Sequence, residues 1–255
     1  MSKRHEAIGL KQTIRLEWMQ QTTNLMLAGV DSKIIRQELH DLLNDKTGSG
    51  NKQERGSTSR SQAVNILMNV WPQPDPDVSA FRTASLTFLR EHPSLALPVH
   101  WGMISSAYPF WFNVARQTGR LLALQDQVTQ AQIINRLKEK YGDRQTVSRY
   151  ARSVIRSFVA WGVLKDSNTK GCYERTEPLN IENQNMCSLL FESALLANPE
   201  AKSALGLLQT HPAFFPFQLP LIPGDLIAQK NNRIELVRYG LDDELLKLKV
   251  PSRQL

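Results

Sequence analysis

The sequence predicts a mainly α-helical protein built around a central winged helix-turn-helix. Apolar residues recur every three or four positions over long stretches, which is the spacing of amphipathic helices. Residues 127–175 also follow the order helix, tight turn, basic helix and short hairpin. We therefore expect a helical N-terminal bundle at 1–100, a winged helix-turn-helix at 101–176, and a C-terminal helical region with a small β-hairpin at 177–255.

Four helices are expected in the N-terminal region. The first covers residues 7–28 and ends at Gly29, a typical residue after a helix C-terminus. Asp31 is expected to cap the second helix and Asp77 the fourth. The polar, glycine-rich segment 44–56 is expected to be an exposed loop. The third helix has three candidate caps and is ended by three prolines: Ser57, Thr58, Ser59, Pro72, Pro74 and Pro76.

An apolar, aromatic segment follows Pro98. Its large side chains are too continuous along the chain to form an exposed stacking surface, so we expect them to pack in the core. They are His100, Trp101, Met103, Ile104, Tyr108, Phe110, Trp111 and Phe112.

The winged unit begins with this segment. Residues 109–124 fit its first helix, and Val128 fits a short strand. Thr129 is a candidate N-cap for a helix over residues 130–141. Gly142 follows it, and glycine supplies the positive φ that a sharp corner between two helices often needs.

The next helix, expected over residues 144–160, divides into two faces. One face is an apolar stripe of Val147, Ala151, Val154, Ile155 and Phe158. Arginine offers a bidentate donor pair to guanine or phosphate, and glutamine can read adenine. No acidic residue occurs from Arg144 to Lys165, whereas a merely solvated face usually mixes both signs. The candidate DNA-binding residues of this helix are Arg144, Gln145, Ser148, Arg149, Arg152 and Arg156.

Two short strands around a tip at residues 168–171 complete the unit as a wing. Lys165, Lys170 and Arg175 belong to this hairpin, and we expect them to contact phosphates beside the groove. Cys172, in the second strand, is expected to be structural rather than nucleophilic.

Positive charge is concentrated around this unit. The chain has 31 Lys and Arg against 24 Asp and Glu, a formal charge of +7. Residues 101–175 hold 12 of the basic and 5 of the acidic residues, so this window carries the whole excess. A local basic patch attracts phosphate backbones by releasing counterions.

The C-terminal region is expected to continue as helix over residues 177–208 and to be irregular over the proline-rich segment 212–223. Residues 225–229 and 233–239 are expected to pair as a hairpin. The acidic run at 242–244 is interpreted as a solvated patch at the end of a helix, and the sequence shows no internal repeat.

Neither a metal site nor a cofactor motif is present in the sequence. The five histidines are scattered, and no nucleotide-binding or nucleophile-elbow motif occurs, so we expect a non-enzymatic protein without cofactors. No apolar run is long enough to span a membrane, and the first residues do not form a secretory signal. With only two cysteines, Cys172 and Cys187, we expect a reducing, cytoplasmic location.

Four stretches together resemble the BrxA-type accessory proteins of bacterial BREX phage-defence islands. They are YPFWFNVARQTGRLL, YGDRQTVSRYARSVIRSFVAWGVL, AFFPFQL and RIELVRYGLDDELL. The resemblance covers most of the chain. It implies a mostly helical, non-enzymatic DNA-binding protein that acts beside other defence proteins, but it assigns no individual residue a role.

Duplex DNA binding through the winged helix is the leading functional hypothesis. Two alternatives stay open. The winged helix could dock a protein partner in a defence complex, as an adaptor or scaffold, or the helical N-terminal region could bind RNA. Homo-oligomerisation is compatible with each hypothesis, and the sequence does not separate specific recognition of a DNA site from general phosphate binding.

Overall fold

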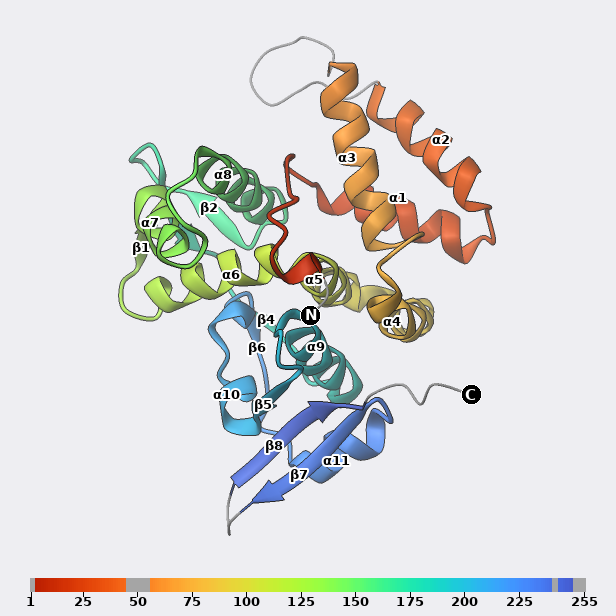
Figure 1. Ribbon diagram of the computed structural model, residues 1–255, viewed down its shortest axis with the longest axis vertical. Helices are drawn as coiled ribbons and strands as arrows, with labels where there is room; N and C mark the ends of the chain where they lie inside the picture. Colours follow the sequence, from red (N-terminus) through yellow and green to blue (C-terminus); the bar gives the residue numbers. More distant parts are fainter. Residues whose placement is uncertain (1–2, 45–55, 240–242, 250–255) are drawn as a thin grey trace.

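The computed structural model describes residues 3–44, 56–239 and 243–249. It is mainly helical, as predicted, and contains three small sheets within the described residues (Figure 1). The described elements, in chain order, are η1 (Lys3–His5), α1 (Leu16–Leu27), α2 (Ser32–Asn44), α3 (Ser57–Val70), η2 (Pro76–Val78), α4 (Ser79–Glu91), η3 (Pro93–Leu95), α5 (Ala96–Ala107), α6 (Pro109–Leu122), β1 (Gln127–Thr129), α7 (Gln130–Tyr141), α8 (Gln145–Ala160), β2 (Leu164–Asp166), β3 (Cys172–Arg175), β4 (Leu179–Asn180), α9 (Gln184–Ala197), β5 (Lys202–Ala204), α10 (Leu205–Gln209), η4 (Pro212–Phe214), β6 (Phe217–Gln218), α11 (Gly224–Lys230), β7 (Ile234–Tyr239) and β8 (Asp243–Leu248).

The first helix is shorter than predicted. It begins at Leu16 instead of residue 7, because the preceding segment is pinned to α8 by tertiary contacts. The backbone N–H of Ile14 donates to Ser157 Oγ at 2.9 Å, and the Trp161 indole donates to the Ile14 carbonyl at 2.9 Å. The predicted loop at 44–56 lies almost wholly outside the described residues.

The predicted caps of this region are partly correct. Asp31 accepts the Lys33 N–H at 2.8 Å at the start of α2. Asp77, however, does not cap α4. Asp75 instead accepts the Asp77 N–H at 3.0 Å, because the chain enters α4 through the 3₁₀ turn η2.

The aromatic segment forms the centre of the core, as predicted. Trp101 and Trp111 are fully buried, and their ring centroids lie 5.4 Å apart. Phe158 of α8 lies 4.8 Å from Trp111 in an edge-to-face contact. Edge-to-face aromatic pairs add stability beyond their buried area, so this cluster fixes α8 on the body of the protein.

Two parts of the chain share one topology. From α6 to β3 the order is helix, strand, helix, helix, strand, strand, and the sheet order is β1-β3-β2. From α9 to β8 the same order recurs, with η4 and β6 inserted before α11, and the sheet order is β5-β8-β7. We call residues 109–175 the basic winged unit and residues 184–248 the C-terminal winged unit. The repeat in topology has no counterpart in a sequence repeat.

The C-terminal unit corrects the predicted hairpin. Residues 225–229 belong to helix α11, and β7 pairs with β8 from Ile234↔Leu248 to Tyr239↔Asp243. Asp243 and Glu244 of the acidic run are therefore not at a helix end, because they begin strand β8. Helix α11 and strand β8 form because Ile227 and Leu246 are both buried in the core. The apolar residues of β8 follow two acidic residues, so the sequence pattern did not indicate a strand there.

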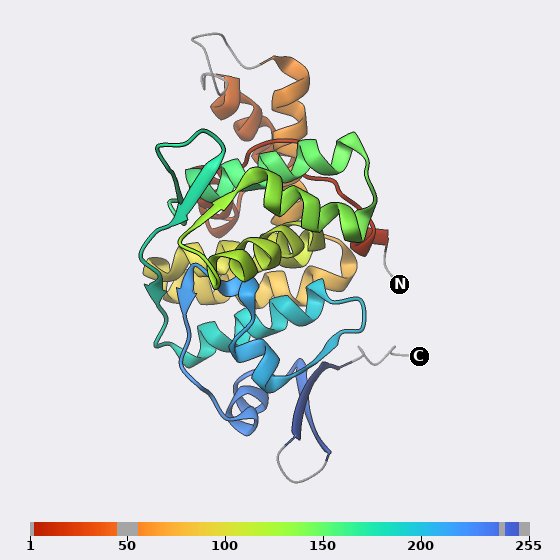
Figure 2. The same ribbon diagram turned by 90° about the vertical axis from the view of Figure 1, so that its left-hand side faces the viewer.

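The long helix expected over residues 177–208 is also divided. Its central part is α9, but β4, β5 and α10 occupy the rest. β4 pairs in parallel with β6, so the predicted irregular segment 212–223 contains one short strand. Figure 2 shows α9 lying between the layer of α5 and α6 and the C-terminal sheet.

Candidate nucleic-acid interface

Helices α7 and α8 meet at a corner with the predicted geometry. Thr129 Oγ1 accepts the Gln132 N–H at 3.1 Å, and the Gln132 side chain accepts the Thr129 N–H at 2.8 Å, which is a reciprocal capping box. Gly142 adopts φ +80°, and its N–H donates to Lys138 O at 2.8 Å. The turn at Gly142 thus ends α7 at Tyr141 and allows α8 to begin at Gln145.

The apolar stripe of α8 is buried as predicted. Tyr150 and Ser157 join it, which the apolar periodicity did not indicate. The complete buried set is Val147, Tyr150, Ala151, Val154, Ile155, Ser157 and Phe158. The opposite face is left outside the core and carries the predicted donors.

Four of the predicted donors on α8 are exposed, namely Gln145, Arg149, Arg152 and Arg156, and Ser148 is half-buried. The Arg149 guanidinium lies 5.0 Å from the centroid of the Tyr150 ring and donates to the Tyr150 hydroxyl at 3.2 Å. A cation held over an aromatic ring is oriented without being neutralised. Among the described residues, Arg152 has no ion-pair partner.

Arg144 has a structural task. It lies in the position before α8, in extended conformation, and α8 begins at Gln145. Its Nε and Nη2 donate to the Tyr141 carbonyl at 3.2 and 2.8 Å. Arg144 therefore satisfies a backbone acceptor at the end of α7, and its remaining donor atoms face solvent.

Two of the predicted contact residues are held by carboxylates. Arg156 Nη1 lies 2.6 Å from Asp166 Oδ1, and Lys165 Nζ lies 2.9 Å from Glu174 Oε2. Burial lowers the pKa of Arg156, but the interactions with Asp166 and Tyr173 together outweigh burial and leave that pKa raised. The hydrogen bond from Lys165 lowers the pKa of Glu174. These two cations are partly neutralised within the unit.

The wing brings Lys170 and Arg175 to the surface. β2 and β3 pair antiparallel, with Lys165 opposite Glu174, and Lys170 is exposed at the tip between them. Arg175 is exposed at the end of β3. No ion pair of either residue is found within the described parts of the chain.

Three basic residues outside the predicted set lie around a cavity beside α6 and α7. Arg116 of α6 and Lys140 of α7 line a cavity of about 130 Å³ together with His211. The sequence signal was a basic pair at Arg116 and Arg120, four residues apart in one helix. Nothing in the sequence indicated that His211, 91 positions after Arg120, would join them.

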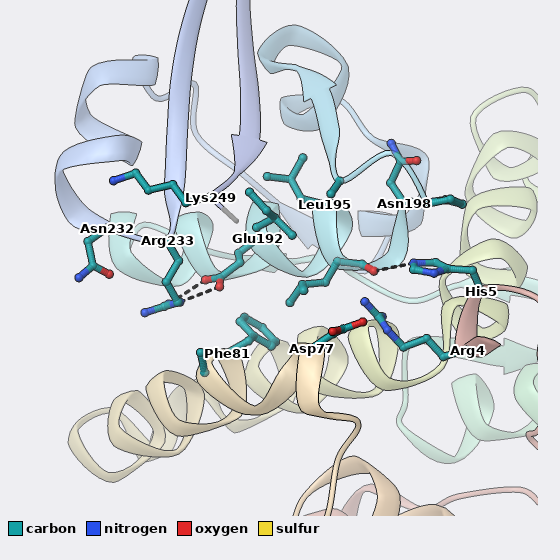
Figure 3. A pocket seen from close by; sticks show the side chains of 15 residues that line it. Arg4, His5, Asp77, Phe81, Glu192, Leu195, Asn198, Asn232, Arg233 and Lys249 are labelled. Carbon is teal, nitrogen blue, oxygen red and sulfur yellow. Dashed lines mark hydrogen bonds and ion pairs between the residues drawn. The ribbon is translucent and has the colours of Figure 1, made fainter. Parts of the chain in front are cut away.

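A larger cavity, of about 530 Å³, lies between η1, α4, α9 and the C-terminal sheet (Figure 3). Glu192 is buried there and accepts Nε and Nη2 of Arg233, each at 2.7 Å. His5 Nε2 lies 3.1 Å from the Leu196 carbonyl. Basic and acidic groups occur together in this cavity, in contrast to the exposed face of α8.

Among the described helices, none combines the length and apolar character needed to cross a membrane. No group of three potential metal-ligating side chains comes together among residues 3–44, 56–239 and 243–249. Cys172 and Cys187 are both free thiols, and burial raises the pKa of Cys187 to about 11.

Comparisons with models of known families, with curated proteins and with solved structures found no match to this chain. Its function is therefore inferred from the geometry and charge of the chain itself.

Proposed function

We propose that this protein binds double-stranded DNA through the basic winged unit, with α8 as the recognition helix. The observation that supports this most is the exposed face of α8, on which every charged residue is basic. It carries Gln145, Arg149, Arg152 and Arg156, and it lies opposite a stripe that is fully anchored in the core. A rigidly docked helix with outward donors is what insertion into a major groove requires.

Within this proposal the residues have different tasks. Arg149 and Arg152 are the principal contacts, because Tyr150 orients the first and no carboxylate among the described residues neutralises the second. Lys170 and Arg175 contact phosphates from the wing. Arg156 and Lys165 contribute less, since each is paired with a carboxylate of the wing.

The resemblance to BrxA-type proteins extends the proposal to a role in phage defence, beside other proteins of such a system. DNA binding does not depend on that extension. A protein-docking role for the same winged unit is the outcome to consider if duplex DNA is not bound.

The test is a salt titration of duplex DNA binding, measured by fluorescence anisotropy. The Arg149→Ala/Arg152→Ala variant should bind more weakly, because it makes fewer contacts with the DNA backbone. Its slope of log affinity against log salt should fall by about one unit for each phosphate that it no longer neutralises. Both side chains are exposed, so the variant should melt at the temperature of the wild type.

A matched control removes the same charge elsewhere. Lys202 and Lys247 lie opposite each other in the C-terminal sheet, and Lys202→Ala/Lys247→Ala should leave DNA binding nearly unchanged. If both double variants weaken binding equally, net charge alone drives the association. If Arg149→Ala/Arg152→Ala binds as tightly as the wild type at every salt concentration, α8 is not the recognition helix.

A further inference from the structure

We propose that the cavity between α6, α7, α9 and α10 is a binding site for a phosphate-type oxyanion, separate from the exposed face of α8. Arg116, Lys140 and His211 line it, and Asn113 forms part of its wall. The proposal does not rest on DNA binding by α8, because none of these residues belongs to the exposed face of that helix.

Positive charge converges on this cavity without compensation. None of the described residues lining it is acidic. They are Phe112, Asn113, Arg116, Lys140, Ala194, Ala197, Asn198, Pro199, Ser203, Leu208 and His211. Arg120 lies near enough for its charge to act on both Arg116 and His211. Cations brought together in partly desolvated positions repel one another, so their proximity costs stability unless an anion binds.

The pKa values of the lining groups reflect both burial and this repulsion between cations. Burial lowers the pKa of Arg116, and the charge of Arg120 lowers it further. Burial, followed by the charge of Arg116, lowers the pKa of Lys140. Burial, followed by the charges of Arg116 and Arg120, lowers the pKa of His211 to about 4. A bound anion would relieve these unfavourable interactions.

Donor atoms remain available at the cavity. Arg116 Nε is buried and makes no hydrogen bond in the described structure. Lys140 Nζ donates one hydrogen bond to Asn113 Oδ1 at 3.1 Å, which leaves two of the three ammonium donors. His211 Nδ1 accepts the Ala213 N–H at 3.2 Å, so the neutral ring carries its hydrogen on Nε2.

The wall of the cavity is preorganised. The Asn113 amide donates to Pro109 O at 2.9 Å and to the Tyr141 hydroxyl at 2.7 Å, so its oxygen is aimed at Lys140. His211 is stacked on Phe112, with ring centroids 4.8 Å apart. A donor set that is held in place before binding does not have to be ordered by the ligand.

The size and chemistry of the cavity favour a phosphate group. A water molecule needs about 10–15 Å³ of cavity volume, so a cavity of about 130 Å³ holds a tetrahedral oxyanion together with water. Guanidinium, ammonium and imidazole donors around a site without carboxylates are typical of phosphate recognition. The phosphate can come from a free anion or from a nucleic-acid backbone, and the experiment separates these two sources.

The experiment titrates inorganic phosphate into the full chain and follows the melting temperature, with chloride at equal ionic strength as reference. Phosphate should raise the melting temperature more than chloride does, because it binds the folded state. Arg116→Gln and Lys140→Gln should each weaken phosphate binding by about tenfold or more, the effect of roughly one charge-assisted hydrogen bond. The control Arg136→Gln removes an exposed cation of α7 that does not line the cavity, and it should respond as the wild type does.

A second readout guards against unfolding of the variants. Because Arg116 and Lys140 repel each other, each Gln variant should melt without phosphate at or above the wild-type temperature. A melting temperature that rises equally with phosphate and chloride would overturn the proposal. So would retention of the phosphate effect in both Gln variants.

The source of the phosphate follows from DNA binding by the same variants. If Lys140→Gln weakens duplex binding and phosphate competes with DNA, the site holds a backbone phosphate. If Lys140→Gln binds DNA normally while losing the phosphate effect, the site holds a free anion. Phosphate binding should persist in Arg149→Ala/Arg152→Ala in either case, so failure of the DNA proposal leaves this proposal testable.

Discussion

The basic winged unit and the C-terminal winged unit share an order of elements and a strand order, but the first has an excess of basic residues and the second an excess of acidic ones. Residues 109–175 contain 12 basic and 5 acidic residues, whereas residues 184–248 contain 5 basic and 7 acidic residues. Helix α8 has 16 residues and a one-signed exposed face, and its counterpart α11 has 7 residues.

The pairing of the charges differs as well. In the C-terminal unit Arg233 is bound by the buried Glu192, and Arg238 is bound by Asp225 and Glu244. In the basic unit Arg149 and Arg152 have no carboxylate partner among the described residues. The shared topology therefore supplies a scaffold, and unpaired charge on α8 distinguishes the basic unit, which we propose to bind DNA, from the C-terminal unit.

The largest expected effect tests whether charge in the C-terminal unit is structural. Glu192→Ala removes the partner of Arg233 and of the Asn231 amide, which donates to Glu192 at 2.6 Å. Breaking a buried ion pair from one side should lower the free energy of unfolding by about 3–5 kcal/mol. Urea denaturation measures the change.

The control for that variant is an exposed ion pair in the C-terminal sheet. Glu235 lies 4.0 Å from Lys247, and both side chains are about half exposed. Glu235→Ala should change stability by less than about 1 kcal/mol. Equal losses in Glu192→Ala and Glu235→Ala would contradict a structural role for the buried pair.

A smaller effect concerns the contact between the two units. A Cβ added at Gly119 of α6 would lie 1.9 Å from the Pro212 carbonyl of η4. Gly119→Ala should therefore cost about 1–3 kcal/mol of unfolding free energy through overpacking, although alanine normally favours a helix. Thermal denaturation followed by circular dichroism measures it.

Gly206 of α10 serves as an unobstructed helical position in the other unit. A Cβ there meets nothing within 4 Å, so Gly206→Ala should be neutral or stabilising by up to about 1 kcal/mol. If Gly119→Ala is as stable as Gly206→Ala, the close approach of α6 and η4 does not hold the units together.

The smallest effect on stability comes from two exposed ion pairs, one in each unit. Asp166→Asn removes the carboxylate partner of Arg156 in the basic unit. Asp225→Asn removes one of the two carboxylate partners of Arg238 in the C-terminal unit, with the same change in net charge. Both pairs are exposed, so each variant should lose less than about 1 kcal/mol. Only Asp166→Asn should strengthen duplex binding, with a steeper salt dependence of about one unit. Equal strengthening by both variants, measured by anisotropy, would show that position on the fold does not matter.

Local patterns made most of the basic unit predictable. The four-and-three spacing of Val147, Ala151 and Val154 identified the buried face of α8, and Thr129 and Gly142 marked the boundaries of α7. These signals act within one helix or one turn, so the sequence contains them directly.

The missed features depend on contacts between distant segments. The start of α1 at Leu16 depends on bonds from Ile14 to α8, and the strand β8 depends on pairing with β7 and β5. The pairing of Arg156 with Asp166, which weakens a predicted contact residue, is also set by the docking of the wing. Tertiary context overrides local propensity in each case.

The sequence alone determined three properties of this protein. The chain is mainly helical, α8 has one apolar face and one face whose charges are all positive, and positive charge is concentrated around that helix. These are properties of periodicity and composition, which do not depend on how distant segments meet. Tertiary contacts were needed to reveal the repeated winged topology, which cations are paired, and the meeting of Arg116, Lys140 and His211 at one cavity. Desolvation and ion pairing depend on distance in space, whereas the pattern of side chains in a helix depends on distance along the chain.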